Sequence, residues 1–173
     1  MLVKFFKIAL ILLFYQSPLY SKTKTLNDFN SHHLSNYFSG IVAYENNNSS
    51  QALKFFRLSK SLIKQHDSYL ENYVYTLVLE GKVQQATSEI KQNLTESNSN
   101  FFEAHLVLAL DSLKRKNYKR SKEHLQRSYE FINNDRLSLI IAETLKQYLY
   151  VFEKNEISKT KNKFGNFSFI NEV

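Results

Sequence analysis

The stretch that decides the fold runs from Gly81 to Ile90 and reads GKVQQATSEI. Its glycine lies where one helical pattern stops, and Ala86 is a small residue early in the helical pattern that follows. A small residue recurs at the same place in two similar patterns, as Ala52, 34 residues earlier, and as Ser121, 35 residues later. A recurrence of about 34 residues predicts an array of helix-turn-helix units whose helices cross closely.

The composition supports long helices in one domain. The chain of 173 residues contains three glycines and one proline, and 43% of its residues are hydrophobic. A formal net charge of +7 favours solubility or weak attraction to anionic surfaces and falls short of a nucleic-acid signature. Without cysteine, the chain cannot form a disulfide, a thiolate metal site, a cysteine nucleophile or a lipid-modified N-terminal cysteine.

Residues Met1–Ser21 resemble an export signal in their composition. Lys4 and Lys7 supply positive charge before the apolar core Ile8–Tyr15, and Pro18 breaks a helix before a candidate cleavage point. The alternative is an uncleaved anchor, but a membrane-spanning helix needs about 20 apolar residues and this core is much shorter. We therefore expect export to the periplasm or cell envelope, with anchoring by the leader as the alternative.

The helical patterns come in three pairs, followed by one further helix. The turn-forming run Asn46–Ser50 separates the helices of the first pair, and Gly81 ends the first helix of the second pair with a positive φ. The expected helices are 33–46 with 50–64, 68–80 with 83–95 and 101–115 with 118–132, and then 137–152.

Residues 33–152 resemble the tetratricopeptide family. Its motif places a small residue midway in the first helix, as at Gly40, a small residue early in the second, as at Ala52, and a large apolar residue four positions later, as at Phe56. Asn47 and Lys116 replace the turn glycine of the family in the first and third units. The residues that match the motif are Gly40, Ala52, Phe56, Gly81, Ala86, Ile90, Ala109, Tyr118, Ser121 and Leu125.

The resemblance implies an all-α fold, a right-handed α-solenoid of about three helix-turn-helix repeats plus one further helix. Together with the leader and the composition of the C-terminal end, the expected division of the chain is a leader at 1–21, a linker at 22–32, a repeat domain at 33–153 and a polar, then apolar, C-terminal tail at 154–173. Arrays of this kind usually hold another chain, so the resemblance implies a scaffold for a protein or peptide partner.

The resemblance also implies a concave face lined by the first helices of the units. This face is expected to be apolar and aromatic with an acidic fringe, which suits a helix or extended peptide with apolar anchors. Its tyrosines are expected to meet the partner and to contribute little to stability, whereas its isoleucine and leucines could equally pack inside the array. The expected partner-binding residues are Tyr37, Ile41, Tyr44, Glu71, Tyr75, Val78, Leu106 and Leu110.

One dense basic run lies at the expected turn between 101–115 and 118–132. It could contact an anionic surface such as phospholipid head groups, but a solvated turn near a helix end is the favoured interpretation. We expect no nucleic-acid partner. The candidate anion contacts are Lys114, Arg115, Lys116, Lys119, Arg120 and Lys122.

No combination of residues indicates catalysis. His32 and His33 have no carboxylate or cysteine at ligand spacing, and Glu103 and His105 point to different faces of one helix. The sequence contains no Gly-rich phosphate loop, no G-x-S-x-G elbow and no H-E-x-x-H motif. We expect no enzymatic activity and no cofactor, and a metal site only where side chains distant in sequence converge.

The end of the repeat pattern is apolar around most of its circumference. The helix expected within Leu137–Phe152 resembles the first helix of a fourth unit, and a second apolar patch, Phe164–Ile170, follows a polar tract. Three explanations are open: a longer array that supplies the missing second helix, dimerisation through this end, or a tail that folds back. The first is preferred.

Three hypotheses about function remain. The leading one is an exported scaffold that binds a protein or peptide, and the second is a membrane-associated assembly factor that contacts anionic surfaces through the basic turn. The third is an enzyme whose site needs residues beyond Val173, as in the N-terminal part of a longer repeat protein.

Overall fold

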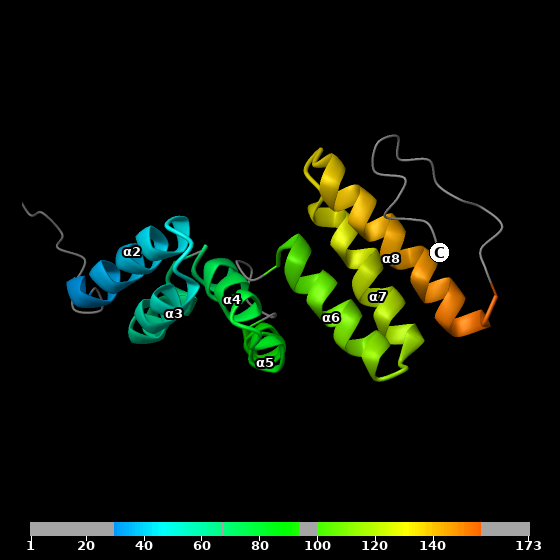
Figure 1. Ribbon diagram of the computed structural model, residues 1–173, viewed down its shortest axis with the longest axis horizontal. Helices are drawn as coiled ribbons and strands as arrows, with labels where there is room; N and C mark the ends of the chain where they lie inside the picture. Colours follow the sequence, from blue (N-terminus) through cyan, green and yellow to red (C-terminus); the bar gives the residue numbers. More distant parts are fainter. Residues whose placement is uncertain (1–29, 67, 94–99, 157–173) are drawn as a thin grey trace, which may run out of the picture. The chain divides into compact units, whose positions relative to one another are not determined.

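The computed structural model describes residues 30–66, 68–93 and 100–156, and over these ranges the chain contains seven α-helices and no β-strand (Figure 1). The all-α prediction is therefore confirmed for this part of the chain. The helices are α2 (Ser31–Glu45), α3 (Ser49–Leu58), α4 (Tyr69–Leu79), α5 (Val83–Asn93), α6 (Phe102–Lys114), α7 (Tyr118–Ser128) and α8 (Arg136–Lys154). Short 3-10 segments follow α3 at Lys60–Lys64 and α7 at Tyr129–Phe131.

The helix boundaries agree with the expected ones within two residues, except at the ends of α3 and α7. Helix α2 begins at Ser31, two residues before the expected start and inside the stretch assigned to a linker. The second helices of the first and third units end early and continue as the two 3-10 segments. The predicted leader, most of the predicted linker and the apolar patch Phe164–Ile170 lie outside the described residues.

The three turns between paired helices share one backbone conformation. Gly81 has a φ of 69°, which confirms the predicted positive φ, and Asn47 and Lys116 each have a φ of 58° although neither is glycine. In every turn, the residue that follows the left-handed residue donates its backbone amide to the carbonyl of the residue five positions before the donor. This bond is typical of a helix that ends at a left-handed residue. These bonds join Asn48 to Ala43 (2.9 Å), Lys82 to Leu77 (2.8 Å) and Asn117 to Ser112 (2.9 Å).

Small residues lie where the paired helices cross. Ala52, Ala86 and Ser121 are fully buried. At Gly40, an added Cβ would lie 2.8 Å from Cε1 of Phe56, so a larger residue here would require the Phe56 ring to shift. Val74, at the corresponding position of the second unit, is bulkier and still 1% exposed, which shows that this crossing accepts a larger side chain.

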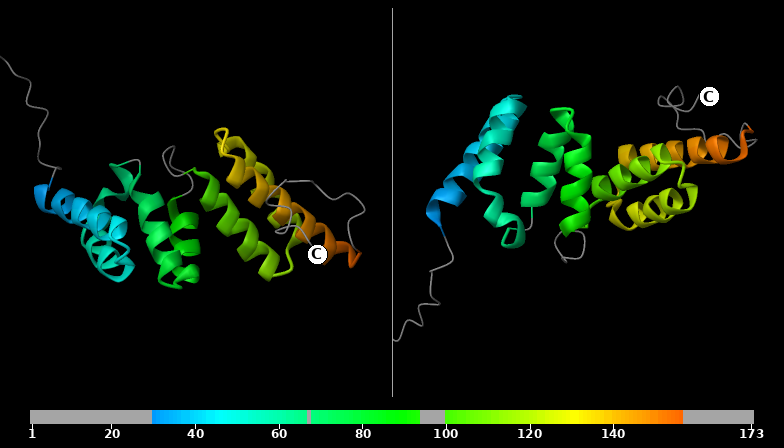
Figure 2. Two further views of the ribbon diagram at one scale, coloured as in Figure 1. Left: turned by 45° about the horizontal axis from the view of Figure 1, so that its top comes forward. Right: turned by 90° about the horizontal axis from the view of Figure 1, so that it is seen from below.

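Each first helix after α2 packs on the second helix of the preceding pair, α4 on α3, α6 on α5 and α8 on α7. Figure 2 shows the successive helix pairs in two further views. One apolar cluster joins α2, α3, α4 and α5 and includes Ala104 and Leu108 of α6. A second joins Phe102 and Ala109 of the same helix to α7 and α8.

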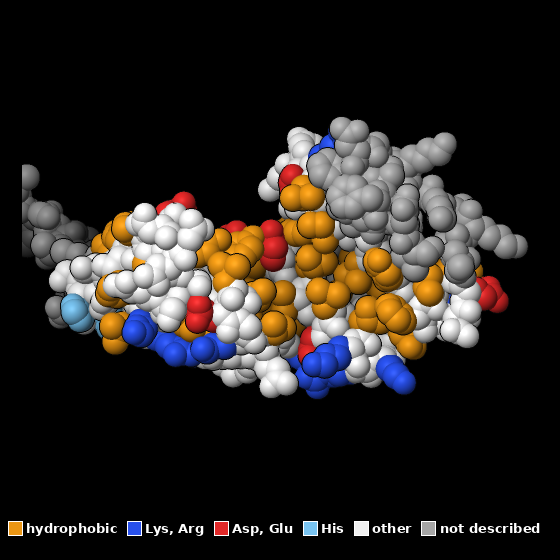
Figure 3. Space-filling model, viewed as in Figure 1, with side chains coloured by type: hydrophobic (Ala, Val, Ile, Leu, Met, Phe, Trp, Pro, Cys, Tyr) orange, Lys and Arg blue, Asp and Glu red, His pale blue; other side chains and the backbone are white. Residues whose placement is uncertain are grey.

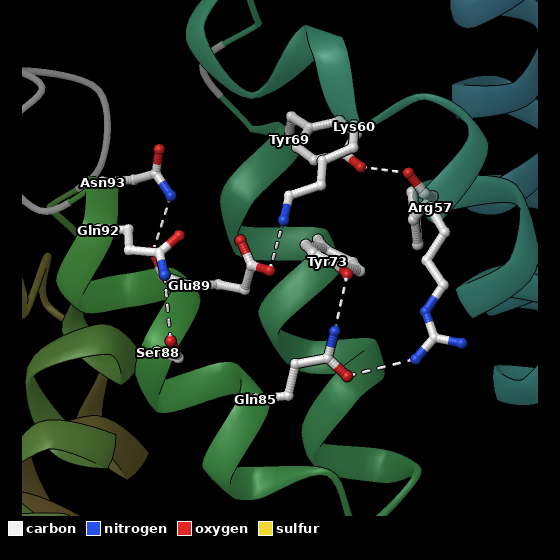
Figure 4. Close-up of polar contacts among 10 residues, drawn as sticks. Arg57, Lys60, Tyr69, Tyr73, Gln85, Ser88, Glu89, Gln92 and Asn93 are labelled. Carbon is white, nitrogen blue, oxygen red and sulfur yellow. Dashed lines mark hydrogen bonds and ion pairs between the residues drawn. The ribbon is translucent and has the colours of Figure 1, made fainter.

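Polar contacts link the second helices of the first two pairs around α4 (Figure 4). Lys60 forms an ion pair of 2.6 Å with Glu89, whose carboxylate is buried between the helices. Gln85 accepts a hydrogen bond from Arg57 at 3.2 Å and donates one to the hydroxyl of Tyr73 at 3.3 Å. These side chains tie α3, α4 and α5 together.

Candidate partner-binding groove

Tyr37 belongs to the core, so its predicted place on a partner-binding surface is wrong. Its side chain is 3% exposed, and its ring packs against Phe56, His66 and Tyr69 at centroid distances of 5.9, 4.4 and 5.8 Å. Asn72 donates a hydrogen bond of 3.1 Å to its hydroxyl. His66 and Tyr69, which follow α3 in the chain, contribute to covering the ring, an arrangement that the spacing within α2 does not reveal.

Three other expected partner residues are partly buried. Ile41 and Tyr44 pack against the first apolar cluster, and Leu106 packs against the second. For Ile41 and Leu106, packing inside the array was the open alternative, and the structure places both side chains there. Tyr44 retains some exposed surface beside α4.

An acidic group of side chains gathers where α2, α4 and α6 approach one another. The hydroxyl of Tyr75 donates a hydrogen bond to the carboxylate of Glu103, and Glu71 and Tyr44 lie within electrostatic range of Tyr75. Desolvation by burial, followed by this bond to a carboxylate, raises the pKa of Tyr75 above its ordinary value. Desolvation and the negative charge of Glu103 raise the pKa of Glu71. The predicted acidic fringe thus comes together, with Glu103 as its central acceptor.

Val78 and Leu110 line an open apolar groove between α5 and α6. Their side chains are 38% and 47% exposed, and Val83, also lining the groove, is 47% exposed. Val107 completes the apolar lining, and the groove encloses about 850 Å³. Of the expected partner residues, these two are the ones that present large apolar surface to solvent, so the structure brings together the predicted anchors from α4 and α6.

The rim of this groove is basic. Asp111 accepts a bond of 2.8 Å from Lys91 of α5 and bonds of 3.2 Å from Arg115. Desolvation by burial raises the pKa of Asp111, but the two cations outweigh it and hold that pKa below its ordinary value. Lys114 also lines the groove. Three cations and one carboxylate give the rim a net positive charge, and the ion pair between Lys91 and Asp111 joins its two walls.

The acidic group and the groove follow matching faces of two first helices. Glu71, Tyr75 and Val78 are spaced by four and three residues on α4, and on α6 the same spacing joins Glu103, Val107 and Leu110 and then reaches Lys114. From Glu103 to Lys114 the face extends about 17 Å. We call these residues the α4–α6 face. It has carboxylates at one end, apolar and aromatic side chains in the middle and the cation Lys114 at the other end.

The predicted anion contacts divide between this rim and the α6–α7 turn. Lys114 and Arg115 line the groove, and Lys122 forms an ion pair of 2.6 Å with Glu153 of α8. Lys116 forms the left-handed turn, while Lys119 and Arg120 are exposed in the first turn of α7. Figure 3 shows Lys and Arg side chains at this end of α6 and α7, below an apolar surface. The basic run is thus partly a turn and partly a groove rim.

Sequence analysis did not identify the groove residues that come from α5. Val83, Thr87 and Lys91 come from a second helix, whereas the family resemblance lines the concave face with first helices. Two features of the sequence could have indicated that α5 lines the groove. One is Val83, an apolar residue in the first turn of α5, and the other is the pair of opposite charges Lys91 and Asp111, 20 residues apart.

Two histidines that are distant in sequence meet beside α6. The rings of His105 and His124 have centroids 5.9 Å apart, and Phe131 stacks on His105 at 5.4 Å. Burial and the positive charges of His124 and Arg127 lower the pKa of His105 to about 4, so this imidazole is neutral near pH 7. In the part of the chain that the structure describes, no three His, Asp or Glu side chains gather at a metal-binding distance.

No helix among the described residues is long and apolar enough to cross a bilayer. Comparison of the chain with family models, with curated proteins and with solved structures found no match. The features of the described residues that bear on function are the α4–α6 face and the regularity of the helix pairs.

Proposed function

We propose that this protein is a non-catalytic helical-repeat scaffold of the tetratricopeptide type, whose α4–α6 face binds a segment of a protein or peptide partner. The observation that carries the proposal is the position of Val78 and Leu110, two exposed apolar side chains beside the basic rim of one groove. Apolar anchors with charged flanks are the usual requirements for holding a helix or extended peptide.

The repeat interpretation is supported by the internal regularity of the chain. Three left-handed turn residues, Asn47, Gly81 and Lys116, are 34 and 35 residues apart, the same intervals that separate the buried small residues. A right-handed solenoid is the arrangement that the family resemblance implies for such pairs. Export to the cell envelope remains part of the proposal and depends on the leader Met1–Ser21.

The charges along the α4–α6 face define the partner's chemistry. The groove accommodates one or two aliphatic side chains between Val78, Val107 and Leu110. Lys114 and Arg115 favour a carboxylate on the side of the segment near the C-terminus of α6. Glu71 and Glu103 favour a cation or an amide donor at the other side, so the partner segment is expected to be apolar in its centre and oppositely charged at its ends.

The test is affinity capture with the wild-type chain and two charge-matched variants. Leu110→Asp places a carboxylate in the groove, whereas Leu58→Asp makes the same change at a residue of α3 that is 59% exposed and does not line the groove. A captured protein is then cut into synthetic peptides, and binding is measured by calorimetry. Leu110→Asp is expected to weaken binding at least tenfold and Leu58→Asp to leave it unchanged. Equal binding by both variants would reject this face as the site.

A second candidate function is contact with an anionic membrane surface through the α6–α7 turn. It is favoured by the exposure of Lys114, Lys116, Lys119 and Arg120 within one turn and the start of α7. Cosedimentation with vesicles containing an anionic phospholipid would show strong salt dependence if this turn binds them. Binding that persists after Lys116→Glu and Lys119→Glu would exclude this function.

A further inference from the structure

Helix α2, blue in Figure 1, has an apolar face that the other described helices leave open. Phe38 is 55% exposed and Val42 is 60% exposed, whereas Tyr37 and Gly40 of the same helix are buried. Phe38 and Val42 line a groove of about 610 Å³ together with Phe55 of α3. Four residues of this groove lie at helical spacing along α2. They are here called the leading face of α2 and are Ser35, Phe38, Ser39 and Val42.

In the second and third helix pairs, the equivalent face of the first helix packs against the pair before it. On α4, Tyr69 packs on Phe56 of α3, and Asn72 donates a hydrogen bond to a tyrosine hydroxyl of α2. On α6, Asp111 accepts the bond from Lys91 of α5. The equivalent positions, counted back from the left-handed turn residue of each pair, are Tyr69, Asn72, Tyr73 and Thr76 on α4 and Ala104, Val107, Leu108 and Asp111 on α6.

The leading face of α2 therefore has the place of a packing surface within its pair. Thr76, the equivalent of Val42, is fully buried, and Leu108, the equivalent of Ser39, is 1% exposed. Among the described residues, no earlier helix pair covers α2 in the same way. Removal of Phe38 and Val42 from water would favour association with another helix at this face.

The charge of this face favours a second copy of the same chain as the occupant. None of the described residues that line the groove is charged. The chain as a whole has a formal net charge of +7, so two copies repel each other least where they meet through an uncharged surface. An anionic partner would instead select the basic α6–α7 turn. Asn46, Asn48 and Gln51 line the groove as well and supply the polar groups that usually surround an apolar contact.

The leading face is also complementary to itself in side-chain size. An antiparallel arrangement of two α2 helices, with a two-fold axis between residues 38 and 39, brings Phe38 of one copy beside Ser39 of the other. The same arrangement brings Val42 beside Ser35. Each large side chain then fills the space next to a small one, and both copies use the same surface, as a two-fold symmetric dimer requires.

We propose that the protein forms a two-fold symmetric dimer through the leading face of α2, with the two α2 helices antiparallel. No residue of the leading face belongs to the α4–α6 face, so the dimer does not depend on the proposed partner. Such a dimer presents two α4–α6 faces, one from each copy.

Cysteine cross-linking in the full chain tests this arrangement, because the chain has no cysteine of its own. Ser35→Cys and Val42→Cys are prepared as separate variants and then mixed. In the antiparallel dimer, equal residue numbers at these two positions lie about 10 Å apart along the helix axis, beyond the span of a disulfide. Mild oxidation is therefore expected to give a covalent dimer in the mixture and none with either variant alone. A mixture that stays reduced, or a single variant that links as well as the mixture, would overturn the proposal.

The oligomeric state provides a measurement without cysteine. Light scattering of the unmodified chain is expected to give twice the mass of one chain. Val42→Asp places a carboxylate in the contact and should weaken dimerisation at least tenfold. Leu137→Asp makes the same change at a residue of α8 that is 50% exposed and should leave the dimer intact.

Circular dichroism establishes that both aspartate variants remain helical. A monomeric wild-type chain would overturn the proposal and leave the leading face to another protein or to another segment of this chain. A dimer that Leu137→Asp disrupts and Val42→Asp does not would also overturn it, and would place the contact at α8.

Discussion

The hydroxyl of Ser121 donates a buried hydrogen bond of 2.7 Å to the carbonyl of Ala109, so the crossing of α6 and α7 is held by a polar contact where the other pairs have alanine. Ser121→Ala is expected to change the free energy of unfolding by no more than about 1 kcal/mol, because the carbonyl remains within α6. Ser121→Leu adds volume to a closed crossing and should cost about 1–3 kcal/mol. Urea unfolding of both variants measures the difference, and equal stabilities would show that this crossing is loosely packed.

At the left-handed turns, two substitutions are expected to change the stability of the chain in opposite directions. Lys116→Gly should stabilise the chain by up to about 1 kcal/mol, since glycine adopts a positive φ without the steric penalty of a side chain. Gly81→Ala should destabilise it by a similar amount, although no atom lies within 4 Å of the added Cβ. Thermal unfolding of the two variants measures both effects. Shifts of the same sign would show that backbone conformation does not control these turns.

Tyr37 is expected to behave as a core residue. Tyr37→Ala removes a ring that packs on three other rings and should lower the free energy of unfolding by about 3–5 kcal/mol. Tyr37→Phe loses the bond from Asn72 and should cost about 1 kcal/mol. Tyr150→Ala on α8, where the side chain is 41% exposed, serves as the control with a small effect. Similar losses for Tyr37→Ala and Tyr150→Ala would contradict the burial of Tyr37.

Acid should weaken the packing around His105. Its pKa falls from about 6.5 in the unfolded chain to about 4 in the folded chain, through burial and the charges of His124 and Arg127. Above pH 7 both states are neutral and stability is unaffected. Between pH 6.5 and 4 the unfolded chain binds the proton first, which costs about 2 kcal/mol of stability at pH 5.

Urea unfolding at pH 7.5 and pH 5 measures this loss. His105→Leu keeps an apolar side chain of similar size against Phe131 and removes the titrating group, so the difference between the two pH values should shrink. An unchanged difference in that variant would assign the acid sensitivity to other groups.

The order of the helices was predictable from the sequence, while much of the candidate site was not. The repeat period is visible at Ala52, Ala86 and Ser121 because each helix crossing restricts the size of the side chain at that one position. The turn at Gly81 was predictable because it depends on residues adjacent in sequence. Asn47 and Lys116 adopt the same turn without glycine, and the same backbone hydrogen bond follows each of the three turn residues.

The side-chain environments depend on contacts between units. The burial of Tyr37 is decided by His66 and Tyr69, which are 29 and 32 residues away, and the groove beside Leu110 needs Val83 and Lys91 from α5. Helical periodicity identifies a face of one helix but does not say which neighbour covers it. Val78 and Leu110 were predicted as groove residues because they occupy equivalent positions on α4 and α6, the first helices of two successive units. The contribution of α5 depends on how the helices pack and is seen only in the structure.

Helix α6 contributes Ala104 and Leu108 to one apolar cluster and Phe102 and Ala109 to the other. A segment bound against Leu110 would therefore bear on a helix shared by both clusters. Ligand binding to the folded state alone raises its stability by RT ln(1 + L/Kd), where L is the free ligand concentration. Melting temperature can then report partner binding without a label, because loss of α6 would release both halves of the array in a single transition.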